Sequence, residues 1–95
     1  MKDLLPLRFR ILHYLSTVEK ACVDEIMKAL KPEYGTEKQF KKQVFMNHLL
    51  DMKANFILDD NDVALDEKGE LVIYYSINPE GRKLLKKYLP KRWTK

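Results

Sequence analysis

The sequence predicts a single α+β domain in which three helices precede a β-hairpin and a fourth helix follows it. Two features of the sequence support this fold class. Apolar residues recur every three or four positions in the first half of the chain, and the spacing shortens toward two after residue 56. A length of 95 residues, with 45% hydrophobic and 34% charged residues, is typical of one folded domain with one core.

The first helix is predicted over residues 4–17, with Asp3 as its N-cap and Pro6 within its first turn. Its apolar residues form two stripes. One stripe consists of Leu4, Leu7, Ile11, Leu15 and Val18, and the other of Leu5, Phe9 and Leu12. This apolar arc is broader than a surface helix needs, so either the helix is deeply buried or the second stripe contacts another subunit.

Two further helices are predicted over residues 23–30 and 37–54. Pro32 ends the earlier one, and Thr36 with Gln39 has the spacing of a capping box that opens the later one. The expected core stripe of this third helix consists of Phe45, Leu49 and Met52. The third helix is therefore predicted to be the longest in the chain.

A β-hairpin is predicted over residues 56–77, and a last helix over residues 79–89. Gly69 suits the left-handed backbone position that closes a turn between the two strands. Asn78 is the expected N-cap of the last helix, which begins at Pro79.

This order of elements, together with three segments, resembles a winged helix-turn-helix domain of the MarR-, PadR- and ArsR-like regulators. The segment YYSINPEGRKLLKKYL, residues 74–89, is similar to their closing strand and final helix. VDEIMKAL, residues 23–30, is similar to the first helix of their helix-turn-helix, and FMNHLLDMKANFI, residues 45–57, to their recognition helix. The resemblance covers nearly the whole chain and implies a winged-helix fold.

The resemblance implies a small sequence-specific transcriptional regulator whose third helix enters the major groove of double-stranded DNA. The residues expected to contact the DNA are Lys38, Gln39, Lys41, Lys42, Gln43, Asn47 and Lys68, the last being the single basic residue of the hairpin turn. Lysine contacts phosphates or guanine, and glutamine and asparagine pair with adenine, so these residue types fit the role.

The resemblance also implies a homodimer that forms through the terminal helices. The expected interface residues are Leu5, Phe9, Leu12, Tyr88, Leu89 and Trp93. They combine the second apolar stripe of the first helix with the apolar side of the last helix and the tail that follows it.

The charge pattern departs from the resemblance. Residues 1–48 carry a balance of +3 and residues 79–95 a balance of +6, whereas residues 49–78 carry −5. A hairpin that lies along DNA is expected to direct lysine or arginine side chains toward the phosphates. The alternative interpretation is a winged-helix module that binds another protein and not DNA. The apolar residues Phe40 and Val44, which lie beside the core stripe of the third helix, support that alternative.

A second departure lies at the end of the third helix. Asn55 stands where the resembling regulators usually place glycine, and asparagine also adopts left-handed backbone conformations. We therefore expect Asn55 to take the glycine's place.

The sequence does not support an enzyme, a metal site or a cofactor. Cys22, His13 and His48 are too far apart to form a metal motif, and the acidic run over residues 59–62 lacks the later ligands of a calcium loop. A single cysteine fits a reducing, cytoplasmic setting, and no stretch approaches the roughly 20 apolar residues of a membrane span.

Overall fold

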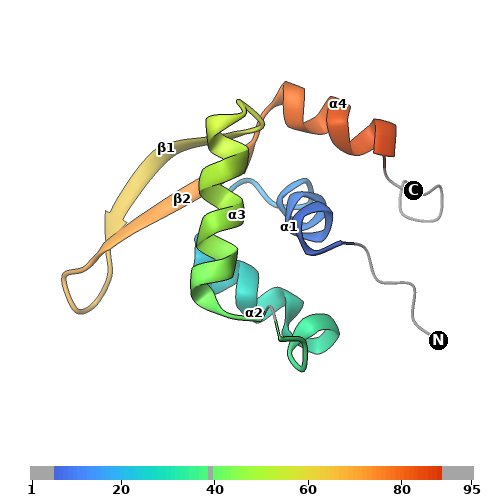
Figure 1. The fold of residues 1–95 in the computed structure, drawn as a ribbon. Helices are drawn as coiled ribbons and strands as arrows, with labels where there is room; N and C mark the ends of the chain where they lie inside the picture. The colour runs from blue at the N-terminus through green and yellow to red at the C-terminus, as the bar shows by residue number, and fades with distance from the viewer. Residues whose placement is uncertain (1–5, 39, 89–95) are drawn as a thin grey trace.

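The chain folds into four helices and an antiparallel hairpin, as seen in a computed structural model that describes residues 6–38 and 40–88 (Figure 1). In chain order the elements are α1 (Leu7–Leu15), α2 (Val23–Tyr34), α3 (Lys42–Ala54), β1 (Leu58–Leu65), β2 (Leu71–Ile77) and α4 (Pro79–Tyr88). The predicted order of three helices, a hairpin and a last helix is therefore confirmed. No helix in the described ranges is both long and apolar enough to cross a membrane.

The first three helices pack around one hydrophobic core. Each helix contributes apolar residues spaced three or four positions apart, which therefore share one face. The largest wholly buried side chains are Phe45, Ile11, Leu12, Leu15, Ile26, Leu30, Leu49, Met52 and Leu58. Tyr75 of the hairpin and Leu85 of α4 complete the core. The predicted core stripe of the third helix is confirmed.

The hairpin has a bulge near its base and a tight turn at its tip. The pairing shifts between Asp59 and Asp62, where β1 contains the extra residue of a bulge. At the tip, the Asp66 amide donates to the Glu70 carbonyl over 2.9 Å. Gly69 has a φ of 79°, so it takes the left-handed position predicted for it.

A third short strand segment extends this sheet on the side of β2. The Ala21 amide donates to the Tyr75 carbonyl over 3.0 Å, and the Tyr75 amide donates to the Ala21 carbonyl over 2.9 Å. Ala21 belongs to the linker between α1 and α2, and both residues of this pair are buried. The pair therefore fastens the base of the hairpin to the helical part of the molecule.

The first helix is shorter than the predicted range of 4–17. It begins at Leu7 with Pro6 as N-cap, and the predicted cap Asp3 lies outside the described residues. At the other end the hydroxyls of Ser16 and Thr17 donate to the carbonyls three residues earlier, over 2.5 and 2.6 Å. These side chains compete for backbone acceptors, and α1 ends at Leu15.

The prediction that Pro32 ends the second helix is wrong. α2 continues through Pro32 to Tyr34, although proline has no amide to donate to the carbonyl of Lys28. Ile26, Leu30 and Tyr34 are spaced four apart and all three are buried. The additional turn brings Tyr34 into the core, and this burial offsets the lost backbone hydrogen bond.

The third helix begins at Lys42 and not at residue 37. Thr36 lies in a turn and caps no helix, and its predicted partner Gln39 lies outside the described residues. Phe40 packs edge-on against Phe45, with ring centroids 5.4 Å apart. Residues five apart in a helix point to different sides, so this contact requires the chain to leave the helical path before Lys42.

The left-handed residue at the end of α3 is Phe56 and not Asn55. Asn55 has a φ of −94°, whereas Phe56 has a φ of 63°. The Ile57 amide donates to the Met52 carbonyl over 2.9 Å, and the Phe56 amide to the Lys53 carbonyl over 3.0 Å. These two bonds form a Schellman motif, which places its left-handed residue one position beyond the helix cap.

The predicted cap of the last helix is confirmed. The side-chain oxygen of Asn78 accepts a hydrogen bond from the Gly81 amide over 2.9 Å, and α4 begins at Pro79. α4 lies next to α1, as Figure 1 shows. Leu89, which was predicted to end this helix, lies outside the described residues.

Candidate nucleic-acid interface

The outward side of α3 carries two amide side chains. Phe45, Leu49 and Met52 hold the opposite side of the helix in the core. Gln43 and Asn47 are exposed one turn apart, and Gln43 Nε2 donates to Asn47 Oδ1 over 2.9 Å. Each amide keeps further donor and acceptor atoms, so this pair is able to bind a planar edge that offers both kinds of group.

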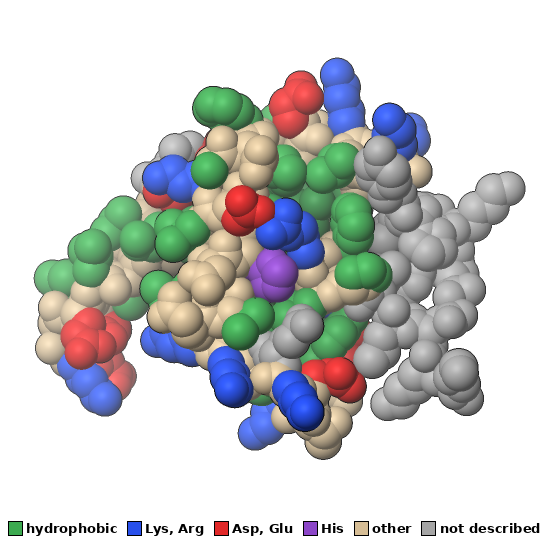
Figure 2. Space-filling view, viewed as in Figure 1, with side chains coloured by type: hydrophobic (Ala, Val, Ile, Leu, Met, Phe, Trp, Pro, Cys, Tyr) green, Lys and Arg blue, Asp and Glu red, His purple; other side chains and the backbone are tan. Residues whose placement is uncertain are grey.

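Three lysines surround the amino end of α3. Lys38 lies in the preceding turn, Lys41 is the N-cap and Lys42 is the first helical residue, and all three are exposed. Lys42 Nζ is 3.4 Å from Asp24 Oδ1, but both side chains are largely exposed and such a pair exchanges readily with other partners. Figure 2 shows basic side chains gathered on this part of the molecule. The lysines add to the positive end of the helix dipole.

The predicted DNA-contact residues are only partly brought together. Lys42, Gln43 and Asn47 lie on α3, whereas Lys38 and Lys41 precede the helix on which they were predicted. Gln39 lies outside the described residues. Lys68 lies in the hairpin turn, which is well separated from α3 (Figure 1).

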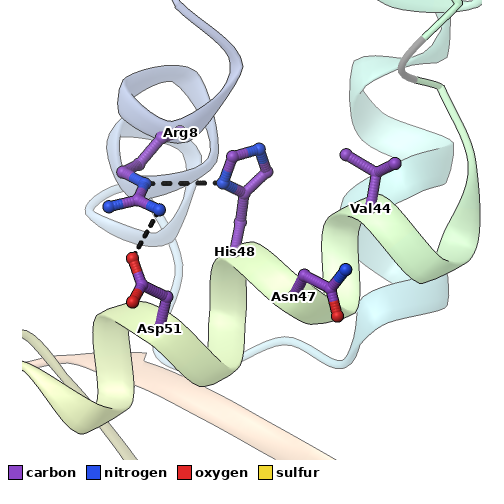
Figure 3. Close-up of a pocket in the computed structure, with 5 residues that line it drawn as sticks. All are labelled: Arg8, Val44, Asn47, His48 and Asp51. Carbon is purple, nitrogen blue, oxygen red and sulfur yellow. Dashed lines mark hydrogen bonds and ion pairs between the residues drawn. The ribbon is translucent and has the colours of Figure 1, made fainter.

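A cluster of side chains beside Asn47 connects α1 to α3 (Figure 3). Arg8 Nη2 is 2.5 Å from Asp51 Oδ2, and Arg8 Nε donates to His48 Nδ1 over 3.4 Å. Together with Val44 and Asn47, these residues line an open pocket. Sequence analysis missed this cluster because Arg8 and His48 are 40 positions apart and no local pattern links them.

The surroundings of His48 lower its pKa and thus favour the neutral ring. Burial and the positive charge of Arg8 lower the pKa of His48, and the carboxylate of Asp51 acts in the opposite direction with a smaller effect. A neutral ring has one unprotonated nitrogen, which is the acceptor for Arg8.

The predicted dimer residues are placed unevenly. Leu12 is wholly buried within the chain, so the expectation that it lies at a subunit interface is wrong, because the broad apolar arc of α1 serves the core. Phe9 is half-buried on α1, and only the backbone of Tyr88 is described. Leu5, Leu89 and Trp93 lie outside the described residues.

Metal ligands are not grouped in the part of the chain that the structure describes. No three His, Cys, Asp or Glu side chains within it lie close enough together to hold an ion. Cys22 is a free, buried thiol at the start of α2, where its amide donates to the Glu25 carboxylate over 3.1 Å.

The fold matches solved structures of transcriptional regulators. A candidate transcriptional regulator from Thermoplasma acidophilum superposes with a TM-score of 0.69 at 17% identity, over 87% of this chain and 74% of that one. A PadR-like transcriptional regulator from Bacillus cereus gives a TM-score of 0.67 at 21% identity, over 85% and 75% of the two chains. No protein-family model and no curated protein sequence matches the chain.

Proposed function

We propose that this chain, whose fold is that of winged-helix transcriptional regulators, binds double-stranded DNA through α3 and acts as a small regulator. The observation that carries the proposal is the composition of the exposed start of α3. Three exposed lysines at Lys38, Lys41 and Lys42 adjoin the exposed amide pair of Gln43 and Asn47. Phosphate-binding and base-reading groups therefore occupy one continuous stretch of surface.

The lysines and the helix end supply the binding energy that does not depend on DNA sequence. The first amides of a helix have no partner within it, and they attract an anion together with the helix dipole. Lys41 and Lys42 stand at this end. A phosphate at this position would fix α3 relative to the duplex while its exposed side faces the groove.

Gln43 and Asn47 supply the base-reading chemistry. Glutamine and asparagine side chains bind the major-groove edge of adenine with two hydrogen bonds. The two amides bind each other in the free chain. Base recognition therefore requires one or both amides to exchange this weak exposed contact for contacts with DNA.

The first test is a fluorescence-anisotropy titration of a labelled mixed-sequence duplex at low and at near-physiological salt. We expect the duplex to bind. The logarithm of the association constant should fall with the logarithm of the salt concentration, with a slope of about −0.9 for each neutralised phosphate. Lys41→Ala with Lys42→Ala should weaken binding about tenfold and reduce the slope. Lys83→Ala with Lys86→Ala on α4 is the matched control, because it removes the same charge from another exposed surface. Absence of wild-type binding at low salt, or equal losses in both variants, would contradict the proposal.

The second test separates base reading from phosphate binding. Gln43→Ala or Asn47→Ala should change the preference among duplexes selected from a random pool, and should leave the salt slope unchanged. Equal preferences in the wild type and in both variants would rule out these amides as base-reading groups.

A further inference from the structure

The outer half of the hairpin has an uncovered apolar face. The exposed fractions of Val63, Leu65 and Leu71 are 51%, 69% and 67%. Val63 pairs with Ile73 and Leu65 with Leu71, so these side chains lie on one face of the hairpin. Alternate residues of β2 continue this face to Tyr75, which is buried in the core. The face that packs on the helices at its base thus extends outward without a cover.

Two apolar side chains of α3 adjoin the hairpin. Met46 and Leu50 are 39% and 51% exposed, and they form one stripe with Lys53 in the next turn. Lys53 Nζ is 2.6 Å from Asp60 Oδ2, so this stripe borders β1. Figure 2 shows apolar side chains along the hairpin on the side that α3 also faces. We call Met46, Leu50, Val63, Leu65 and Leu71 the apolar face.

The area of the apolar face suits an interface between two copies of the chain. Its five residues expose on the order of 500 Å² in total, which lies within the range of the largest apolar patch on a typical monomer, and such a patch is often functional. Complete burial of two such faces would remove about 1,000 Å² of surface in total over both copies. This area is the lower limit for a specific protein interface, even without neighbouring residues.

Opposite charges lie on the two sides of the apolar face. Asp66, Glu67 and Glu70 surround the one lysine of the hairpin turn, and among the described residues neither glutamate forms an ion pair. The basic group at the start of α3 consists of Lys38, Lys41 and Lys42. Figure 1 shows the hairpin tip and the start of α3 at the same end of these two elements and apart from each other.

We propose that two copies of the chain associate through their apolar faces, with the hairpin of each copy lying on α3 of the other. The two-fold axis of such a dimer runs along the apolar face, between α3 and the hairpin. Rotation about it brings the hairpin of one copy opposite α3 of the other. It places each acidic tip on the basic group of the other copy and each hairpin on the other copy's Met46 and Leu50. The charges on either side of the apolar face are therefore complementary to those of a second copy, and not to those of a uniformly acidic or basic partner.

Pairing of two β1 edges is a less favourable arrangement. The base of β1 carries Asp59, Asp60 and Asp62, and a bulge interrupts its pairing there. Charged side chains and bulges on an outer strand oppose the addition of another strand. The contact between faces avoids this repulsion because it uses the side chains and not the strand edge.

The contact would cover Gln43 and Asn47, which lie on the same side of α3 as Leu50. The dimer and the DNA complex then exclude each other; this consequence, unlike the dimer itself, rests on the proposed function.

The test of the dimer is sedimentation velocity of the full chain without DNA over a wide range of protein concentration. We expect a monomer–dimer equilibrium that Leu65→Glu with Leu71→Glu shifts at least about tenfold toward monomer. Both side chains are largely exposed, so circular dichroism should show an unchanged fold. Lys83→Ala with Lys86→Ala on α4 is the control for the same change of two units in net charge, and it should leave the equilibrium unchanged.

A charge exchange tests the arrangement of the two copies. Glu67→Lys with Glu70→Lys, and separately Lys41→Glu with Lys42→Glu, should each weaken the dimer about tenfold. An equimolar mixture of these two variants should dimerise again, because in the mixed dimer each hairpin tip faces a helix start of opposite net charge.

Three results would overturn the proposal. They are a wild-type chain that is monomeric at every concentration, a dimer that none of these substitutions weakens, and a mixture of the charge variants that stays monomeric. The second result would place the interface elsewhere, such as at the terminal helices. Because these experiments contain no DNA, their failure leaves the proposed DNA binding untouched, and a failed DNA titration leaves the dimer untouched.

Discussion

Phe56 combines a strained backbone with an exposed aromatic ring. Its φ of 63° lies in the left-handed region, and its side chain is 78% exposed. A bulky residue in this region costs about 1–2 kcal/mol relative to glycine, because its Cβ crowds the backbone. The hydrogen bonds of the Schellman motif hold the residue there, although its ring contributes little to the core.

Phe56→Gly should therefore stabilise the chain by about 1 kcal/mol, because glycine adopts this backbone conformation without strain. Urea unfolding followed by circular dichroism would measure the change in the free energy of unfolding. Phe56→Ala removes the same ring but keeps the Cβ, so it should not stabilise the chain. A gain of equal size in both variants would attribute the effect to the loss of the ring and not to backbone strain.

His48 should make stability depend on pH. Because the folded state lowers the pKa of His48, the unfolded chain binds the proton more readily. The stabilisation is complete above the ordinary histidine pKa of about 6.5 and falls as the pH decreases below it. We expect His48→Gln to lose less stability than the wild type when urea unfolding is compared between about pH 7.5 and pH 5. Arg8→Gln should reduce the dependence only in part, since burial also lowers this pKa; identical pH profiles in the wild type and His48→Gln would contradict the assignment.

At the scale of the elements, α4 packs on the hairpin base through a close approach at Gly81. A Cβ added at Gly81 would lie 2.5 Å from the Ile57 carbonyl oxygen and 2.8 Å from Ile77 Cγ1. Both distances are shorter than van der Waals contact, and the first involves backbone that cannot rotate away. Glycine at this position is thus a requirement of packing.

Gly81→Ala should destabilise the chain by about 1–3 kcal/mol, the usual cost of overpacking. Thermal unfolding would register the change as a lower Tm. Gly69→Ala is a useful comparison, because a Cβ at Gly69 meets no atom within 4 Å and only its φ of 79° opposes alanine. A smaller loss for Gly81→Ala than for Gly69→Ala would show that α4 adjusts its position freely.

The elements that could be predicted from sequence are those that local interactions decide. The Asn78 cap, the turn at Gly69 and the core stripe of α3 depend on residues within a few positions of one another. The errors at Pro32 and at the start of α3 have a different origin. Burial of Tyr34 and the contact of Phe40 with Phe45 override local preference, and both depend on packing that local patterns do not encode.

At the scale of the whole molecule, the proposed dimer and the proposed DNA complex use the same side of α3. Leu65→Glu with Leu71→Glu should therefore bind DNA more tightly than the wild type at protein concentrations where the wild type is dimeric. The gain should disappear at concentrations low enough for the wild type to be monomeric. Anisotropy titrations at several ratios of unlabelled protein to duplex would measure both regimes. Weaker binding by the variant at every concentration would instead indicate that DNA binding requires the dimer.

Only the part of the candidate site whose residues are close together in the sequence could be predicted from sequence. Lys42, Gln43 and Asn47 are neighbours on one helix, and their exposure follows from the burial of Phe45 and Leu49. The Arg8 cluster joins residues from α1 and α3, and the apolar face joins α3 to the hairpin. Such surfaces arise from the relative placement of elements, which periodicity within one element does not specify.

The two backbone hydrogen bonds between Ala21 and Tyr75 have a consequence for the motions of the hairpin. They hold its base against the buried core, whereas the outer half has no such anchor. Amide hydrogen exchange should accordingly be slowest at Tyr75 and Ala21 and become faster toward residue 69. The hairpin is thus held at its base and free to move at its tip. Any molecule that covers its apolar face would slow amide hydrogen exchange chiefly in the outer half.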